Sequence, residues 1–387
     1  MDILKKTNIL ANAGKYDSCG PKMCEVSVNE GLGGIYHAKA EHKTCRLFKT
    51  LMSNDCKFDC KYCANANGCT KNKAKYEPKE LAKVFDHIQK KLDVQGLFLS
   101  SAVSNNPDQI TEEMIESVNI LRNQYKFKGY VHFKVLPGTS YELIKQASEI
   151  SHRMSINLEA PNKTAMHELS SCKEYKVDIL RRQSWIAKLA KKSNILQGGQ
   201  TTQLILNKLS TDKDVLKMVN WEYENLDMKR MYFSAFRPVK GTPLQNEPAE
   251  PLSRQNHLYN VDFLMRDYKF KAKEFYSIMN NEMLPKEDPK LALAKANFDG
   301  ALDINEANYE ELIRIPGIGP KTAQLIIKKT QKEKTKITKY EHLHELGGWI
   351  NRAKPFISVD GKRQAMLGEF AWRLVGPVRL VRLVRMW

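Results

Sequence analysis

The chain has 387 residues, of which 42% are hydrophobic and 27% are charged, as is typical of soluble globular proteins. The chain contains no run of eighteen apolar residues, so no transmembrane helix is predicted. The first residues lack the apolar core of a signal peptide, and we expect a cytoplasmic protein with no membrane partner. Lys and Arg outnumber Asp and Glu by 62 to 44, a net charge of +18. That charge favours nucleic acid as a partner, although a solvated basic surface is the plainer alternative.

From about Cys45 onward, short apolar runs alternate with segments of helical periodicity. The runs predict strands within 45–53, 96–103, 129–136, 154–160, 201–207 and 229–236, and helices between them include 78–92, 112–124, 141–148 and 213–226. Strands that alternate with helices pair in parallel through right-handed crossovers. We therefore predict an α/β fold, a partial (β/α)6 TIM-like barrel, with an open doubly wound sheet as the alternative. In either fold, site residues belong at the carboxyl ends of the strands.

Changes in composition predict five regions. We expect an N-terminal arm at 1–30, the barrel core at 31–245, a helical connector at 246–298, a small all-α module at 299–355 and a basic tail at 356–387. Three prolines in 241–251 mark the end of the core. The last seventeen residues contain arginine but no lysine, unlike the rest of the chain, so they suggest either an amphipathic helix or a cloning scar.

The cysteines are concentrated near the N-terminus, with seven of the eight in the first 69 residues. In a long chain without a secretion signal, this clustering indicates metal ligation rather than disulfides. Cys56, Cys60 and Cys63 have the spacing C-x3-C-x2-C in the loop after the first predicted strand. Three thiolates on a [4Fe-4S] cubane leave one iron open to a chelating substrate. Two alternatives are zinc, with Cys69, Cys45 or His37 as fourth ligand, and a second cluster on Cys19, Cys24, Cys45 and Cys69.

With this spacing, and with the aromatic Tyr62 directly before the third cysteine, the loop resembles that of the radical S-adenosylmethionine (SAM) superfamily. The resemblance implies that Cys56, Cys60 and Cys63 hold a [4Fe-4S] cluster and that Tyr62 lies near the adenine of SAM. It also implies reductive cleavage of SAM to a 5′-deoxyadenosyl radical, with an electron donor such as a ferredoxin or flavodoxin.

Polar residues at the ends of later strands are candidates for binding SAM. The superfamily carries a Gly-Gly-Glu segment after the second strand, where this chain has Ser100 and Ser101 and no glutamate. Hydroxyl groups still form hydrogen bonds. Asn157 and Glu159 alternate along the fourth predicted strand and so share a face. The fifth strand adds further polar positions, Gln200 and Gln203 among them.

A second motif follows a helix predicted from Tyr309 to Ile315, in the sequence PGIGP. Its glycines permit positive backbone angles, and the next helix begins with unpaired N–H groups that bind phosphate. The segment resembles a helix-hairpin-helix motif, which binds the nucleic-acid backbone without sequence preference. The predicted contacts are Gly317, Ile318, Gly319, Lys321 and Thr322. A hairpin that serves only packing is the alternative.

Taken whole, the chain resembles radical SAM proteins of DNA modification or repair that end in a helix-hairpin-helix. The similar segments are ANAGKYD, GLFLSSAV, GYVHFKVLPG, SINLEAP, GGQTTQLIL and YFSAFRPV, within a resemblance that reaches about Phe356. It implies radical attack on a base or sugar of DNA and association with a uracil-DNA-glycosylase-like protein. The alternatives are RNA or tRNA as substrate, SAM as a methyl donor, and a non-enzymatic iron–sulfur or zinc sensor that binds DNA.

Overall fold

The computed structural model describes residues 1–15, 33–40, 43–69 and 72–363. The chain divides into two compact units, Met1–Tyr259 and Asn260–Trp387, which we call the barrel unit and the hairpin unit. The division falls within one helix, α8, so it comes later than the boundary predicted near residue 245. None of the helices in the described ranges has the length and hydropathy of a membrane span.

The barrel unit alternates strands with helices, as predicted. Its elements are α1 Ile3–Ala13, β1 Ile35–Ala40, β2 Lys43–Leu51, α2 Pro78–Leu92, β3 Gly96–Ser100, α3 Pro107–Asn123, β4 Tyr130–Lys134, α4 Tyr141–Ile150, β5 Arg153–Ser155, α5 Lys163–Leu169, a π-helical segment Tyr175–Leu180, α6 Arg181–Ala190, β6 Gln200–Leu206, α7 Asp212–Leu226, β7 Arg230–Ala235 and α8 Leu252–Tyr268.

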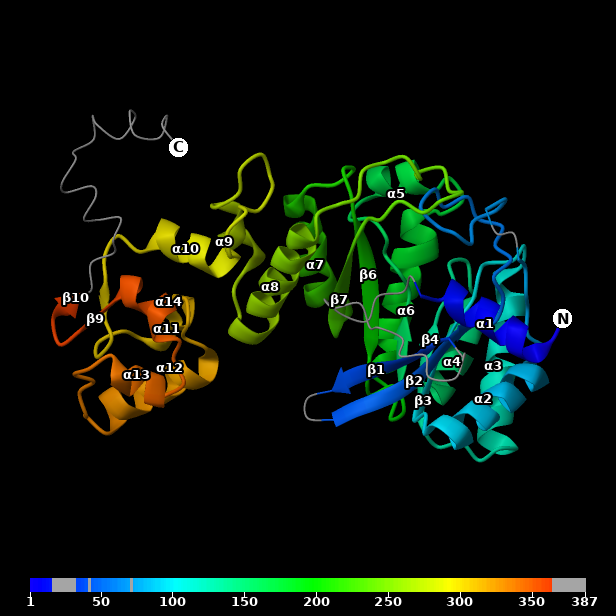
Figure 1. The fold of residues 1–387 in the computed structure, drawn as a ribbon, viewed down its shortest axis with the longest axis horizontal. Coiled ribbons are helices and arrows are strands. Elements are labelled where there is room, and N and C mark those ends of the chain that lie inside the picture. The colour runs from blue at the N-terminus through cyan, green and yellow to red at the C-terminus, as the bar shows by residue number, and fades with distance from the viewer. Residues whose placement is uncertain (16–32, 41–42, 70–71, 364–387) are drawn as a thin grey trace. The chain divides into compact units, whose positions relative to one another are not determined.

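One sheet contains β1 to β7 in chain order (Figure 1). β1 pairs with β2 antiparallel, and each later pair from β2 to β7 is parallel. Six parallel strands confirm the predicted (β/α)6 barrel, and the sheet order does not close β7 onto β1 among the described residues, so the barrel is partial. The antiparallel β1 is an addition to the strands predicted from the sequence.

Helix α2 shows how the sequence fixes these elements. Pro78 occupies its first turn, and Glu77 and Glu80 form a capping box, so the helix begins where the backbone N–H groups are satisfied. The fully buried Phe85 lies on its inner face, with its ring centroid 6.4 Å from that of Phe48 on β2. Burying an aromatic side chain of this kind contributes about 1.5–3 kcal/mol.

The hairpin unit is smaller and mixed in structure. Besides the end of α8, its elements are α9 Ala272–Tyr276, α10 Pro289–Asn297, β8 Leu302–Asp303, α11 Tyr309–Arg314, α12 Pro320–Ile327, a π-helical segment Lys328–Lys332, α13 Glu341–Glu345, α14 Ile350–Ala353, a 3-10 turn Lys354–Phe356, β9 Ile357–Val359 and β10 Lys362–Arg363. The last three strands form a sheet in the order β10-β9-β8. The prediction of an all-α module is therefore wrong.

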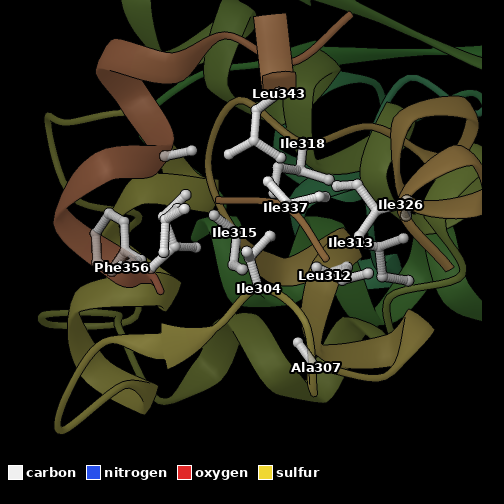
Figure 2. Close-up of a cluster of buried hydrophobic side chains, with 14 of the residues drawn as sticks. Ile304, Ala307, Leu312, Ile313, Ile315, Ile318, Ile326, Ile337, Leu343 and Phe356 are labelled. Carbon is white, nitrogen blue, oxygen red and sulfur yellow. The ribbon is translucent and has the colours of Figure 1, made fainter. Parts of the chain in front are cut away.

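A cluster of buried hydrophobic side chains forms the core of this unit (Figure 2). Ile313 and Ile326 come from the two helices of the hairpin, while Phe356 and Ile357 come from the segment after it. The predicted tail therefore begins too early at residue 356, because 356–359 complete this core. The arginine-rich end of the chain, 364–387, lies outside the described residues.

Candidate cofactor site and nucleic-acid interface

The cysteine loop, residues 54–77, leaves the carboxyl end of β2 and is closed at its neck by one side chain. Asn54 is only 3% exposed, its Oδ1 accepts from the Ala74 N–H at 2.7 Å, and its Nδ2 donates to the Asn72 carbonyl at 2.9 Å. The Asn54 N–H also donates to the Ala74 carbonyl at 3.2 Å. A buried amide at the start of the loop thus bonds the returning segment at two residues and fixes the neck of the loop.

Backbone hydrogen bonds then tie the loop to segments that follow other strands. The Lys57 N–H donates to Val103 after β3 at 2.8 Å, and the Lys61 N–H donates to Leu169 at the end of α5 at 2.9 Å. The Lys61 carbonyl accepts from Leu244 after β7 at 3.2 Å. The loop therefore lies at the carboxyl edge of the parallel sheet, where catalytic groups gather in this class of fold.

The three thiols of the motif, Cys56, Cys60 and Cys63, are free, and Cys60 is buried. Backbone N–H groups of Phe58 and Asn65 lie 3.4 Å from the sulfurs of Cys56 and Cys63, respectively. Burial, followed by the charge of Cys60, raises the pKa of Cys63 to about 12, so without a bound metal this thiol is protonated at neutral pH. Cluster assembly would thus release protons.

The donor chemistry of these thiols fits an iron–sulfur cluster. No group of three or more His, Cys, Asp or Glu side chains is arranged to hold one metal ion in the described part of the chain. A cubane places its thiolates on separate iron atoms, so its ligands need not meet at one point. Three free thiols with N–H donors beside two of the sulfurs match that donor chemistry, in which hydrogen bonds to sulfur tune the metal.

Lys173, which the sequence analysis did not identify, connects the motif to the predicted SAM residues. Its side chain is 7% exposed, and its ammonium lies 3.4 Å from the Tyr62 hydroxyl and 4.0 Å from a carboxylate oxygen of Glu159. Burial lowers the pKa of Lys173, but the opposing influence of Cys60 and Glu159, including a hydrogen bond to Cys60, leaves the pKa raised. The lysine is therefore a buried cation held between Cys60 and a carboxylate.

The segment before Lys173 is fixed to the cysteine loop by Asp59. Its carboxylate accepts from the hydroxyl of Ser170 at 2.6 Å and from the backbone N–H of Ser171 at 3.0 Å. Burial raises the pKa of Asp59, but the hydrogen bonds from Ser170 and Ser171 outweigh it and hold the pKa well below its usual value. Asp59 therefore stays ionised and binds the 170–173 segment to the motif.

Glu159 lies in an uncommon backbone conformation at the same edge. Its φ is +62°, a left-handed value that costs a non-glycine residue free energy unless the surroundings impose it. The surroundings do so here, because its N–H donates to Gln203 on β6 and its carbonyl accepts from Ile205, both at 2.9 Å. The Asn157 side chain donates to the Glu159 carboxylate at 3.2 Å, so this predicted pair is brought together.

The two serines lie beside the start of the cysteine loop. Ser100 ends β3 and its carbonyl accepts from Met52 at 2.7 Å, while the Ser101 hydroxyl accepts from the Ser53 N–H at 3.2 Å. The Ser101 hydroxyl is thus engaged by the backbone of the chain that leads into the motif.

Gln200 does not join the other predicted residues. It begins β6, and its amide donates to the carbonyls of Gln183 on α6 and Leu226 on α7, so it points toward the helices. Gln203 has the opposite parity along the strand and lies opposite Tyr232 on β7. The structure therefore separates two glutamines that the sequence analysis grouped.

One of the remaining cysteines, Cys172, lies beside the motif, because its backbone N–H donates to the Asp59 carboxylate at 3.3 Å. Cys45 lies on β2 opposite Ala38, Cys69 lies late in the cysteine loop, and Cys172 is exposed. Cys19 and Cys24, the other members of the predicted second cluster, lie outside the described residues.

In the hairpin unit, the PGIGP turn joins α11 to α12 as predicted. Gly317 has a φ of +87°, and a Cβ at this position would overlap the carbonyl oxygen of Trp349, so the position requires glycine. Gly319 is the N-cap of α12 and makes no side-chain cap, and Lys321 in the first turn is exposed. Partly exposed glycines and a lysine at a helix N-terminus provide backbone N–H groups and positive charge for a phosphate.

Two of the predicted contacts are turned inward. The Ile318 side chain is 2% exposed and packs in the hydrophobic core, and Thr322 is 7% exposed. The Ile318 carbonyl accepts from the buried ammonium of Lys290 at 2.7 Å, and that ammonium lies 4.6 Å from the centre of the Tyr268 ring. These residues support the turn from inside and leave Gly317, Gly319 and Lys321 as its outer groups.

A groove of about 590 Å³ runs along the outer side of α12. Its lining is mostly basic and apolar, with Tyr309, Lys321, Gln324, Leu325, Ile327, Lys328 and Lys332. Three lysines around a partly apolar floor suit a phosphate-bearing chain.

Comparison with known families gives one match, in which the helix-hairpin-helix motif covers residues 301–329. This match confirms the predicted motif and includes the whole PGIGP turn. No curated protein sequence matches the chain.

Among solved structures, the chain is similar to the [FeFe]-hydrogenase maturase HydG from Carboxydothermus hydrogenoformans, with a TM-score of 0.45 and 9% identity over 57% of this chain and 51% of that one. It is also similar to methylornithine synthase (PylB), with a TM-score of 0.46 and 15% identity over 57% and 61% of the two chains. For SuiB of Streptococcus suis, the values are 0.42 and 15% over 56% and 45%. The matched part spans about half the length of these proteins.

Proposed function

We propose that this protein is a [4Fe-4S]-dependent radical SAM enzyme that modifies or repairs nucleic acid, with DNA favoured over RNA. The observation that carries the proposal is the cysteine loop, whose three free thiols lie at the carboxyl edge of a partial barrel beside a buried lysine. When bound, the cluster and SAM supply a 5′-deoxyadenosyl radical that abstracts otherwise inert hydrogens.

The chain's own residues hold and shield this chemistry. Cys56, Cys60 and Cys63 are the cluster ligands, and the Lys173 ammonium lies close enough to Cys60 for that cysteine to raise the lysine pKa. Glu159, held in place by β6, presents a carboxylate suited to the amine of SAM. Asn157 orients that carboxylate from a distance of 3.2 Å.

The hairpin unit supports nucleic acid as the substrate. Its turn presents the outer groups of Gly317, Gly319 and Lys321, and the chain as a whole carries a net charge of +18. Contacts of this kind hold phosphate without reading sequence. The base or sugar that reacts would then be chosen at the barrel unit, after leaving the stack if it lies in a duplex.

Anaerobic reconstitution with iron and sulfide tests the enzyme directly. The protein is mixed with dithionite, SAM and duplex DNA or RNA of the same sequence, and 5′-deoxyadenosine is measured by mass spectrometry. We expect wild-type protein to form it, and we expect Ala at Cys56, Cys60 or Cys63 to abolish it because each supplies one cluster ligand. Mass added to or lost from the DNA, with RNA unchanged, would support the choice of DNA.

Cys69→Ala is the matched control, because Cys69 lies in the same loop and is also a free thiol. A cluster on the three motif cysteines predicts full activity in this variant. Loss of metal from Cys69→Ala, with zinc rather than iron in the wild-type protein, would instead indicate a tetrahedral zinc site and contradict the proposal.

A further inference from the structure

The largest exposed apolar side chain of the hairpin unit belongs to Trp349, in the turn between α13 and α14. It is 73% exposed, more than any other large hydrophobic residue in the described part of the chain. Single apolar side chains on a surface are common and need no function. What distinguishes Trp349 is where its backbone is held.

The backbone of Trp349 is fixed against the phosphate-binding turn. Its N–H donates to the Gly317 carbonyl at 2.9 Å, and a Cβ on Gly317 would lie 3.2 Å from the Cβ of Trp349. The same turn reaches α12 at Gly347, where an added Cβ would lie 3.6 Å from the Thr322 hydroxyl. The 346–349 turn therefore adjoins both Gly317 and Thr322, at the two sides of the predicted phosphate site.

The turn itself is well determined by hydrogen bonds. Gly347 has a φ of +84°, its N–H donates to His344 at 2.9 Å, and the Gly348 N–H donates to Leu343 at 2.8 Å. The Leu343 side chain is in the hydrophobic core (Figure 2). A turn fixed by these hydrogen bonds thus presents a large aromatic side chain to solvent, so that less backbone entropy is lost when that side chain binds a partner.

The charge around Trp349 indicates the partner. Arg352, whose Cβ would lie 3.2 Å from a Cβ placed on Gly317, is 42% exposed at its side chain and forms an ion pair with Asp288 at 3.2 Å. Lys321 is exposed on the first turn of α12. An aromatic ring among cations that bind phosphate is the arrangement with which proteins stack unpaired bases, since every base offers a π-face. A fully paired duplex keeps its bases stacked and offers no such face.

We propose that Trp349 stacks on an unpaired base next to the phosphates bound by the hairpin, so that the unit prefers nucleic acid with an unpaired nucleotide to a continuous duplex. This inference rests on the nucleic-acid part of the proposed function. It adds to it a specific structural feature of the substrate.

Binding of the full-length protein to two DNA probes tests the inference by fluorescence anisotropy. One probe is a fully paired duplex, and the other is the same duplex with a single bulged adenine. We expect Trp349→Ala to weaken binding to the bulged probe by about 5- to 150-fold, which is the usual contribution of one base–aromatic stack. Binding to the paired probe should stay within about twofold of wild type. Trp349→Phe should restore most of the difference, because phenylalanine also stacks.

Two control variants separate this inference from the function on which it rests. Lys321→Ala should weaken binding to both probes equally, because the substitution removes a contact to phosphate. Trp221→Ala removes a 38% exposed tryptophan of the barrel unit and should change neither. If Trp349→Ala binds both probes as tightly as the wild type does, or if its affinity for both probes falls equally, the stacking role is wrong. Binding of nucleic acid by the hairpin would still be supported in either case. If the wild-type protein binds neither probe, the nucleic-acid function is wrong as well.

Discussion

The cysteine loop and the hairpin turn are both loops that present polar groups, but they are built in opposite ways. The cysteine loop depends on residues far along the chain, since Lys173 and Ser170 meet Tyr62 and Asp59 across 111 positions. The hairpin turn depends mainly on its own glycines and on a second turn about thirty residues later. The first site buries charge and the second exposes it. A buried site is therefore sensitive to loss of a distant charge, and an exposed turn is sensitive to added bulk.

Loss of the buried cation should have the largest effect. Lys173→Met leaves Glu159 without its cation, and breaking a buried pair costs about 3–5 kcal/mol of stability. In the loaded protein, a positive charge near Cys60 favours the reduced cluster, so its removal should lower the midpoint potential by roughly 50–150 mV. Thermal unfolding of the apo-protein and a redox titration followed by electron paramagnetic resonance measure the two effects.

Two variants sharpen that test. Lys173→Arg keeps the charge and should recover most of the potential. Lys163→Met breaks an exposed ion pair with Glu174, 3.3 Å long, and should cost less than about 1 kcal/mol. An unchanged potential in Lys173→Met would mean that the lysine serves packing alone.

Added bulk at the hairpin should have the next largest effect. Gly317→Ala places a methyl group against the Trp349 carbonyl at a φ of +87°, and a strained residue of this kind costs about 1–3 kcal/mol. We expect faster hydrogen exchange in the hairpin unit and weaker DNA binding, since the new methyl group displaces the turn. Gly300→Ala is the matched control, because nothing lies within 4 Å of its added Cβ. Equal exchange in the two variants would show that the turn adapts freely.

The same contrast explains how far the sequence could predict the molecule. The cysteine spacing and the PGIGP turn are local patterns, and both were recognised, as was the strand–helix alternation that makes the partial barrel. Lys173 carries no local signal, because its role depends on a contact made by folding. Gln200 and Gln203 differ in strand parity and so point to opposite faces of the sheet. The predicted strand began at residue 201, one residue after the observed start, so Gln200 was not assigned to either face. The β8–β10 sheet was missed because its strands have only two or three residues.

Glu222 offers the most selective comparison, since it is a buried carboxyl with no cation beside it in the described structure. It lies on α7, fully buried and near Gln183, and burial raises its pKa to about 8 from an ordinary 4.5. A carboxyl whose folded pKa is raised stabilises the fold below pH 4.5 and loses that contribution as the pH rises toward 8. Stability should therefore fall across this window by at most about 1.4 kcal/mol per pH unit.

Glu222→Gln keeps the shape of the side chain and cannot titrate. We expect it to unfold in urea at nearly the wild-type midpoint at pH 5 and at a clearly higher midpoint than wild type at pH 8. The reason is that only wild-type unfolding is favoured at pH 8 by release of the proton from this carboxyl. Glu224→Gln, an exposed neighbour on the same helix, should leave the pH dependence unchanged. Parallel pH profiles for wild type and Glu222→Gln would mean that water or Gln183 stabilises the ionised carboxylate. In that case a buried carboxylate on this helix would need no cation. The stability effect expected at Lys173 would then have to come from the interaction of Lys173 with Cys60 and not from its neutralisation of Glu159.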